Sequence, residues 1–181
     1  MTTVESKSFD EVGSNAAARI EWRWHAFDEL TLHDLYAVLR LRQRVFVVEQ
    51  NCAYLDLDDS DQQASHLMAW TQDDVPALIA YARLFLPGIK FAESSIGRVI
   101  TAPEARRTGI GKVLMSEAIE RAEQVAPESA IRIGAQIHLE KFYGDFGFRR
   151  ASEPYDEDGI MHIEMVRAVT AAKFPAVSHH G

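Results

Sequence analysis

A basic turn that contains two glycines is the part of this sequence best suited to bind a reactive ligand. Arg106, Arg107 and Lys112 supply positive charge in a chain whose formal net charge is -8, and Gly109 and Gly111 leave the backbone open to close approach. A β-branched stretch precedes the turn, and apolar residues at helical spacing follow it. The first amides of a helix lack intrahelical partners and carry positive potential. A phosphate or pyrophosphate is therefore the expected ligand.

Two common phosphate-binding motifs do not fit this turn. A P-loop requires glycine where Arg106 stands and a serine or threonine after Lys112, where the sequence has Val113. A dinucleotide-binding fingerprint requires a third glycine at the position of Leu114. The turn is then either another class of anion site or an ordinary helix start on a solvated basic turn.

The pattern that does match is Arg-x-x-Gly-x-Gly, present as Arg106, Gly109 and Gly111 after the strand-like residues 99–101. It resembles the acetyl-coenzyme A signature of the GCN5-related N-acetyltransferases, the GNAT family. A second motif about thirty residues on, QIHLEKFYGDFGF, is similar to that family's Asn-x-x-Ala-x-x-aromatic-Tyr-x-x-x-Gly-Phe pattern. Gln136 replaces the asparagine and Leu139 the alanine. The runs RVFVVEQNCAYLDLDDSD, AYARL, IGRVIT, GAQIHL and DGIMHIEM resemble the bacterial ElaA branch.

The resemblance implies an α/β fold in which a mixed central β-sheet is flanked by helices. In the GNAT fold a V-shaped split separates the two central parallel strands. Residues 20–168 would form this domain, residues 1–19 a mobile N-terminal arm, and residues 169–181 a flexible C-terminal tail.

The resemblance also implies acetyl-coenzyme A (acetyl-CoA) as cosubstrate, with no metal. The pantetheine would pair with the backbone of Val99, Ile100 and Thr101 and approach Gln136 and Tyr143. The pyrophosphate would bind the turn formed by Arg106, Arg107, Thr108, Gly109, Ile110, Gly111 and Lys112.

By the same resemblance, Tyr143 is the general acid that protonates the departing sulfur; the alternative is that it is only a packing aromatic. A phenol with a pKa of about 10 is protonated at neutral pH and can serve as an acid. The amine must also lose a proton, and Glu49, His66 and His138 are candidate acceptors because they lie near expected strand or helix ends.

The amino-acid composition limits the domain organisation, the class of partner and the cellular location that can be expected. With 181 residues, 47% of them hydrophobic, the chain is expected to form one globular domain. The net charge of -8 argues against a nucleic-acid partner and favours a small amine or an amine-bearing peptide. Cys52 is the only cysteine, and no apolar run is long enough for a membrane span, so a cytoplasmic protein is expected. Pairing into a homodimer is compatible with the sequence.

Hydrophobic periodicity indicates how the two motifs are positioned. Strands are expected at residues 20–24, 67–70, 77–86, 96–101, 130–136, 148 onward and 160–166, with helices at 32–46, 110–122 and 138–146. Thr31 followed by Asp34 predicts the start of the first helix.

An acidic cluster at Asp56, Asp58, Asp59 and Asp61 has two interpretations. It is either a solvated loop or a wall of the acceptor site that attracts an ammonium group. A calcium loop is excluded, because Asp61 stands at the position of the required glycine. Arg83 and Arg98 could pair with this cluster or line the cleft.

Two other functions remain as alternatives. A non-catalytic module that binds acyl-CoA would keep the pyrophosphate turn without turning over any amine. An acyl-homoserine lactone synthase is suggested by Arg42 and Phe46, which resemble that family's Arg-x-x-x-Phe element, but Cys52 lies where its tryptophan is expected.

Overall fold

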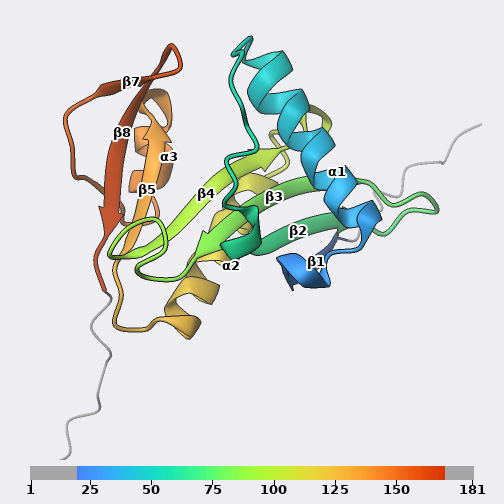
Figure 1. Ribbon diagram of the computed structural model, residues 1–181, viewed down its shortest axis with the longest axis horizontal. Helices are drawn as coiled ribbons and strands as arrows, with labels where there is room; N and C mark the ends of the chain where they lie inside the picture. The colour runs from blue at the N-terminus through green and yellow to red at the C-terminus, as the bar shows by residue number, and fades with distance from the viewer. Residues whose placement is uncertain (1–19, 170–181) are drawn as a thin grey trace, which may run out of the picture.

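The central feature of the fold is one mixed sheet of eight strands (Figure 1). The computed structural model describes residues 20–169, so the predicted arm and all but the first residue of the predicted tail lie outside it. The strand order is β1-β2-β3-β4-β5-β8-β6, with β7 paired to β8. The strands are β1 (Ile20–Ala26), β2 (Ser65–Thr71), β3 (Leu78–Phe85), β4 (Ser94–Thr101), β5 (Ile131–Gln136), β6 (Arg149–Arg150), β7 (Tyr155–Glu157) and β8 (Ile160–Arg167).

The sheet splits between its two central strands. The parallel pair β4 and β5 is in register at only two positions, Ser94 with Ile131 and Ser95 with Arg132. Beyond these pairs the two strands diverge, as Figure 1 shows, so the C-terminal half of β4 has no partner on its β5 side. The predicted V-shaped split is confirmed. It divides the sheet into an arm of β1 to β4 and an arm of β5 to β8.

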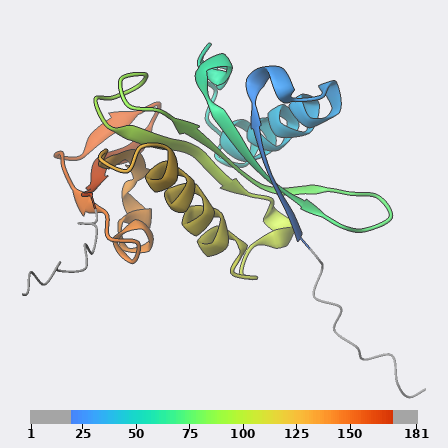
Figure 2. The same ribbon diagram turned by 90° about the horizontal axis from the view of Figure 1, so that it is seen from below.

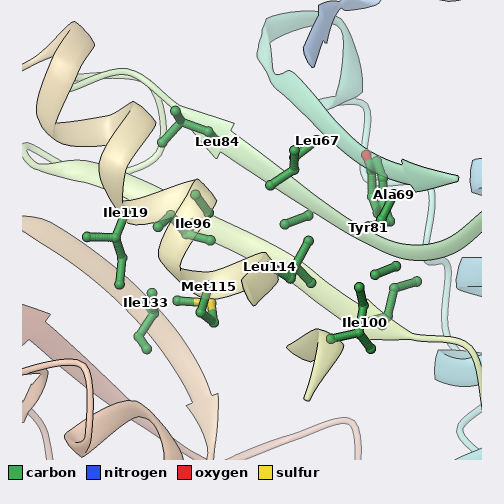
Figure 3. Close-up of a cluster of buried hydrophobic side chains, with 14 of the residues drawn as sticks. Leu67, Ala69, Tyr81, Leu84, Ile96, Ile100, Leu114, Met115, Ile119 and Ile133 are labelled. Atoms are coloured by element: carbon green, nitrogen blue, oxygen red, sulfur yellow. The ribbon is translucent and has the colours of Figure 1, made fainter. Parts of the chain in front are cut away.

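Helices cover both faces of the sheet. Figure 2 shows α2 (Ile110–Val125) and α3 (Glu140–Gly144) on one face and α1 (Leu32–Arg42) on the other. The apolar face of α2 packs on β3 and β4, where Leu114 and Met115 are fully buried against Leu84 and Ile96 (Figure 3). This core makes the junction between β4 and α2 a rigid support for the glycine turn.

The first helix begins as predicted but buries a different face. Thr31 caps it, accepting a hydrogen bond from the Asp34 amide at 3.1 Å. The apolar residues at helical spacing include Leu32 and Tyr36, yet both are exposed, while Val38 and Arg42 are buried. Apolar periodicity does not detect this face because a buried arginine forms part of it. The helix continues as a π-helix over Gln43–Glu49, in place of the α-helix expected to residue 46.

No helix among residues 20–169 is both long and apolar enough to cross a membrane.

Candidate active site

A cleft of about 820 Å³ opens between the two arms of the sheet. Its walls come from the unpaired half of β4, from β5, and from the β7–β8 hairpin and the segment that follows the π-helix. The structure brings together most of the predicted site residues there: Glu49, Val99, Ile100, Thr101, Arg106, Gln136, His138 and Tyr143 line the cleft.

The glycine turn adjoins the cleft: Thr101 and Arg106 line the cleft, whereas residues 107–112 follow Arg106 and are not among the lining residues. Gly109 has a φ of 90°, a left-handed conformation that favours glycine, and α2 starts at the next residue. Among the described residues, the amides of Arg107, Thr108, Gly109 and Gly111 have no acceptor. They can therefore bind an anion at the positive end of α2.

Two other amides of the predicted pyrophosphate site are already occupied. The Ile110 amide points to Thr108 Oγ1 at 3.4 Å, and the Lys112 amide donates to the Gly109 carbonyl at 2.9 Å. The Ile110 side chain is buried in the core. The N–H groups of these two positions are thus used within the turn and the start of the helix, and the part that Ile110 and Lys112 take in the pyrophosphate site stays a prediction.

Glu49 is bound to the glycine turn. Both of its carboxylate oxygens accept hydrogen bonds from Arg106, at 2.6 and 2.8 Å. This pairing lowers the pKa of Glu49 below its usual range. A carboxylate that is held by a guanidinium and has a lowered pKa is a poor proton acceptor, so the expectation that Glu49 is the base loses its support. Its observed contact links the π-helix to the turn.

A β-bulge lies in β4 beside the cleft. Tyr81 pairs with Ile100 but Arg83 pairs with Gly97, so one extra residue is inserted in β4. Arg98 lies in the bulge with a φ of 49°, a strained conformation for a residue with a side chain. The bulge alters the direction of the backbone at the start of the unpaired segment, before Val99 and Ile100.

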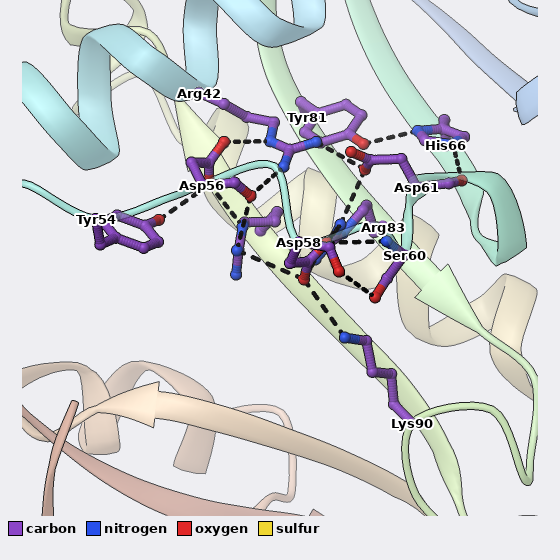
Figure 4. A network of polar contacts seen from close by, with 11 residues as sticks. Arg42, Tyr54, Asp56, Asp58, Ser60, Asp61, His66, Tyr81, Arg83 and Lys90 are labelled. Carbon is purple, nitrogen blue, oxygen red and sulfur yellow. Dashed lines mark hydrogen bonds and ion pairs between the residues drawn. The ribbon is translucent and has the colours of Figure 1, made fainter. Parts of the chain in front are cut away.

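The acidic cluster is mostly paired with arginines: only Asp59 is exposed, while Asp58 lines the cleft together with Arg83 and Arg98. Three of its aspartates, on the segment of residues 50–64, form ion pairs with three arginines from α1, β3 and β4 (Figure 4). The pairs have donor–acceptor distances of 2.7 to 2.9 Å and join Arg42 with Asp56 and Asp61, Arg83 with Asp58 and Asp61, and Arg98 with Asp56. We call this set the Asp–Arg network.

The Asp–Arg network fixes the segment of residues 50–64 over the sheet. Burial alone would raise the pKa of Asp61, but hydrogen bonds from Arg42 and Arg83 outweigh that effect and lower it. Arg98 binds Asp56 at 2.8 Å and so also holds the strained bulge. Arg42 has no exposed surface and does not reach the cleft, although Phe46 does.

Tyr143 lies at the bottom of the cleft and is 6% exposed. Its ring makes edge contacts with Phe142 and Phe148, at centroid distances of 5.1 and 6.2 Å. No hydrogen-bond partner of its hydroxyl is found among residues 20–169. Burial raises its pKa to about 12, so the hydroxyl stays protonated across the neutral range.

His66 is not brought to the cleft, which corrects its prediction as a proton acceptor. The residue is 1% exposed, on β2 in the arm of β1 to β4. Its two ring nitrogens bond to the Tyr81 hydroxyl at 2.7 Å and the Asp61 carbonyl at 2.9 Å. Neither nitrogen is free to take a proton from a substrate. The imidazole instead fastens the Asp–Arg network to the sheet (Figure 4).

His66 is expected to make the protein sensitive to mild acid. Burial lowers its pKa from 6.5. As the pH falls below about 6.5, the unfolded chain binds a proton that the folded protein excludes, so the free energy of unfolding decreases by up to about 1.4 kcal/mol per pH unit. Urea unfolding between pH 7.5 and 5 measures this slope.

The His66→Gln variant is expected to be less stable but to have a flatter slope over the same pH range. His33→Gln changes an exposed histidine of α1 and serves as the control. A slope in His66→Gln equal to that of the unaltered protein would contradict the assignment.

Sequence reasoning missed the side of the cleft formed by the β7–β8 hairpin. Tyr155, Glu157, Asp158 and His162 line it. Cys52 closes this side, since its thiol donates to the Asp158 carbonyl at 3.2 Å across the cleft. The alternation of Ile131 and Ile133 predicted which face of β5 is buried. In β8 the apolar residues Ile163 and Met165 alternate in the same way, and this pattern places His162 on the opposite face.

A second contact crosses the split near the ends of the strands. The side-chain amide of Gln136 on β5 donates to Gln50 Oε1 at 3.2 Å. The position expected to approach pantetheine therefore lies inside the cleft, with its amide group accessible to a ligand that displaces Gln50. Among residues 20–169, no group of three or more His, Cys, Asp or Glu side chains is placed to hold a metal ion.

Comparisons with known proteins identify the family. The model of the acetyltransferase (GNAT) domain matches residues 44–169. Protein ElaA of Escherichia coli is 42% identical over 155 residues, which cover 84% of this chain and 99% of that protein. A UPF0039 protein of Synechocystis is 42% identical over 147 residues, covering 81% and 94% of the two chains.

Solved structures agree with this match. A crystal structure of an acyl-CoA N-acyltransferase from Pseudomonas aeruginosa is 41% identical, with a TM-score of 0.78, and covers 83% of this chain and 100% of that one. A Bacillus subtilis acetyltransferase shares the fold at 21% identity and a TM-score of 0.58, over 84% and 99% of the two chains. With its split sheet, glycine turn and matched domain, the chain belongs to the GNAT acetyltransferase family.

Proposed function

We propose that this protein transfers an acetyl group from acetyl-CoA to a primary amine of a small molecule or peptide, by direct attack in a ternary complex. The observation that carries the proposal is the unpaired half of β4, which leads directly into a turn with four unoccupied amides. An unpaired strand edge and free amides at a helix start are the two features that a pantetheine amide chain and a diphosphate require.

The relatives support this choice of cosubstrate. The Pseudomonas aeruginosa protein is described as an acyl-CoA N-acyltransferase, and the Bacillus subtilis structure was solved in complex with CoA. In this chain the pantetheine would lie along Val99 to Thr101, with the diphosphate at the amides of Thr108, Gly109 and Gly111.

The bulge of β4 is suited to polarise the thioester. An amide from the redirected backbone near Val99 and Ile100 would donate a hydrogen bond to the thioester carbonyl. Such a donor stabilises the negative charge that develops on oxygen in the tetrahedral intermediate. Because the Asp–Arg network holds Arg98, this donor would be fixed before the substrate arrives.

The proposed reaction accounts for every bond and proton with groups found in this cleft. The amine nitrogen bonds to the acetyl carbon, and the carbon–sulfur bond breaks with its electron pair on sulfur. An ammonium acceptor loses two protons overall: one is released to solvent and one ends on the CoA thiol. Tyr143 would donate its hydroxyl proton to the departing sulfur and regain a proton from the attacking nitrogen, which loses its second proton as the amide forms. Its raised pKa means that this transfer accompanies or follows cleavage of the carbon–sulfur bond.

A turnover screen tests the proposal. The purified protein is incubated with acetyl-CoA and a panel of primary amines and peptides, and the release of free CoA thiol is measured, with calorimetric titration of acetyl-CoA in parallel. We expect binding of acetyl-CoA and thiol release with at least one class of amine. Binding without thiol release across the panel would overturn the enzymatic proposal in favour of a non-catalytic acyl-CoA module.

A further inference from the structure

In the arm of β5 to β8, three residues on neighbouring strands form a polar strip in the cleft: Gln136 on β5, His162 on β8 and Tyr155 on β7. In the antiparallel register, His162 lies opposite Gln136 on β5 and opposite Tyr155 on β7. Directly paired residues of neighbouring strands point to the same face of a sheet. All three line the cleft, and the rings of Tyr155 and His162 stack with their centroids 6.1 Å apart.

This strip faces away from the helices that carry Tyr143 and the glycine turn. On β5 and β8, Ile133, Ala135, Ile163 and Met165 are buried in the core with α2. His162 alternates with these residues and so lies on the opposite face, which α2 and α3 do not cover (Figure 2). An acceptor that enters from this face would meet His162, while the cofactor is held by α2.

The ring of His162 is oriented by its own strand. Its Nδ1 lies 2.8 Å from the Ile160 carbonyl oxygen. A carbonyl oxygen can only accept a hydrogen bond, so Nδ1 carries the hydrogen of the neutral ring and Nε2 carries the lone pair. The side chain is 14% exposed, and Nε2 has no partner among the described residues. A neutral imidazole with an available Nε2 lone pair in a cleft can accept a proton.

Charged and titratable groups from three segments surround His162. From β7, Glu157 places Oε2 at 3.8 Å from Nδ1, and Tyr155 lies beside the ring. Asp158 lines the cleft at the hairpin turn, and Glu164 lies two residues along on β8. On β5 the paired residue is the uncharged Gln136, and from the segment of residues 50–64 the Cys52 thiol contacts the hairpin at the Asp158 carbonyl, while Tyr54 and Asp58 also line the cleft. The charged side chains among these neighbours are all carboxylates.

We propose that His162 is the catalytic residue that accepts the proton of the acceptor ammonium, through Nε2, in the acetyl transfer described above. The inference rests on that proposed function. The ammonium N–H bond breaks, its proton bonds to Nε2, and the freed nitrogen lone pair attacks the acetyl carbon. The imidazolium then releases the proton to solvent.

The other predicted proton acceptors are less suited to this role. Glu49 is held by Arg106, and both nitrogens of His66 are occupied. His138 lines the cleft, but it stands in the 3-10 turn Ile137–Leu139 that leads into α3, on the cofactor side. His138 is the rival that the experiment must separate from His162.

The test compares two acceptors in the full-length protein. His162→Gln is assayed with acetyl-CoA and n-butylamine, a charged ammonium at neutral pH, and with hydroxylamine, which is uncharged there. We expect kcat/KM for n-butylamine to fall about 100-fold at pH 7 and to recover as the pH rises and free amine accumulates. With hydroxylamine we expect a loss of less than about tenfold, because no ammonium proton must be removed before attack.

Two further variants and one measurement complete the test. His33→Gln, on the exposed side of α1, is expected to leave both reactions unchanged. An equal loss with both acceptors in His162→Gln, or an n-butylamine-specific loss in His138→Gln instead, would overturn the assignment. Nitrogen-15 spectra of the unaltered protein should show the neutral His162 ring protonated on Nδ1, and protonation on Nε2 would also overturn it. If no amine of the panel releases thiol, the proposed function is wrong, and the assignment of His162, which rests on it, is wrong as well.

Discussion

Replacement of Tyr143 by phenylalanine is expected to lower kcat by at least about 100-fold while the affinity for acetyl-CoA changes little. The hydroxyl lies in the cleft without a partner among residues 20–169, and burial raises its pKa to about 12, so it is a proton donor at every working pH. Phenylalanine keeps the ring that packs against Phe142 and Phe148. The substitution therefore removes the proton donor and leaves the packing intact.

Single-turnover thiol release measures this effect, because it follows the chemical step separately from cofactor binding. Tyr36→Phe removes an exposed hydroxyl on α1 and is the matched control. If Tyr143→Phe turned over at the rate of the unaltered protein, the tyrosine would be a packing aromatic only, and the proton for sulfur would have to come from another group.

The second large effect concerns stability. Arg42→Met is expected to lower the free energy of unfolding by about 3–5 kcal/mol, the usual result of removing one partner from a buried ion pair. The side chain has no exposed surface and donates to Asp56 at 2.8 Å and to Asp61 at 2.7 Å. Methionine fills similar space but leaves buried carboxylates with fewer donors. The segment of residues 50–64 that they hold should become easier to open.

Urea unfolding at pH 7.5 gives the free energy, and hydrogen exchange of residues 50–64 reports the local opening. The chain offers a matched control two residues away: Arg44 pairs with Glu104 at 2.9 Å, but its side chain is 51% exposed. Exposed pairs contribute little, so Arg44→Met should change stability only slightly. Equal effects of the two substitutions would show that burial of the Asp–Arg network does not matter.

The cofactor side of the cleft could be predicted from the sequence because its features are local. The strand, the glycine turn and the amphipathic helix follow one another directly, so residues 96–122 describe most of that wall. The second motif likewise places Gln136 and Tyr143 on consecutive elements. The hydrophobic pattern predicted β1 to β5 and β8, but it did not separate β6 and β7 as two short strands.

The acceptor side could not be predicted because its contacts are distant in the sequence. The sequence left the acidic cluster open between a solvated loop and a cleft wall; it allowed pairing with Arg83 and Arg98, which is confirmed, but the pairing with Arg42 of α1 was not expected. The β4 bulge contains Arg98, which binds Asp56 from a segment distant in the sequence, and no local sequence pattern predicts the bulge. His162 acquires its position only when β8 pairs with β5 and β7, a register that periodicity does not specify.

The account depends most on one claim, that the amides at the start of α2 bind the diphosphate of acetyl-CoA. Gly111 tests it directly. A Cβ at this position would lie 3.6 Å from Cγ2 of Thr101, a residue that lines the cleft, and this is an ordinary contact that the folded protein accommodates. Gly144→Val on α3, where a Cβ meets nothing within 4 Å, is the matched control.

The decisive measurement is calorimetric titration of acetyl-CoA into the unaltered protein and these two variants. We predict that Gly111→Val binds about tenfold to a hundredfold more weakly, the effect of losing about 1.5–3 kcal/mol of hydrogen bonding to a charged group, while Gly144→Val binds as the unaltered protein does. Equal affinity in all three proteins, or no binding to the unaltered protein, would contradict the central claim.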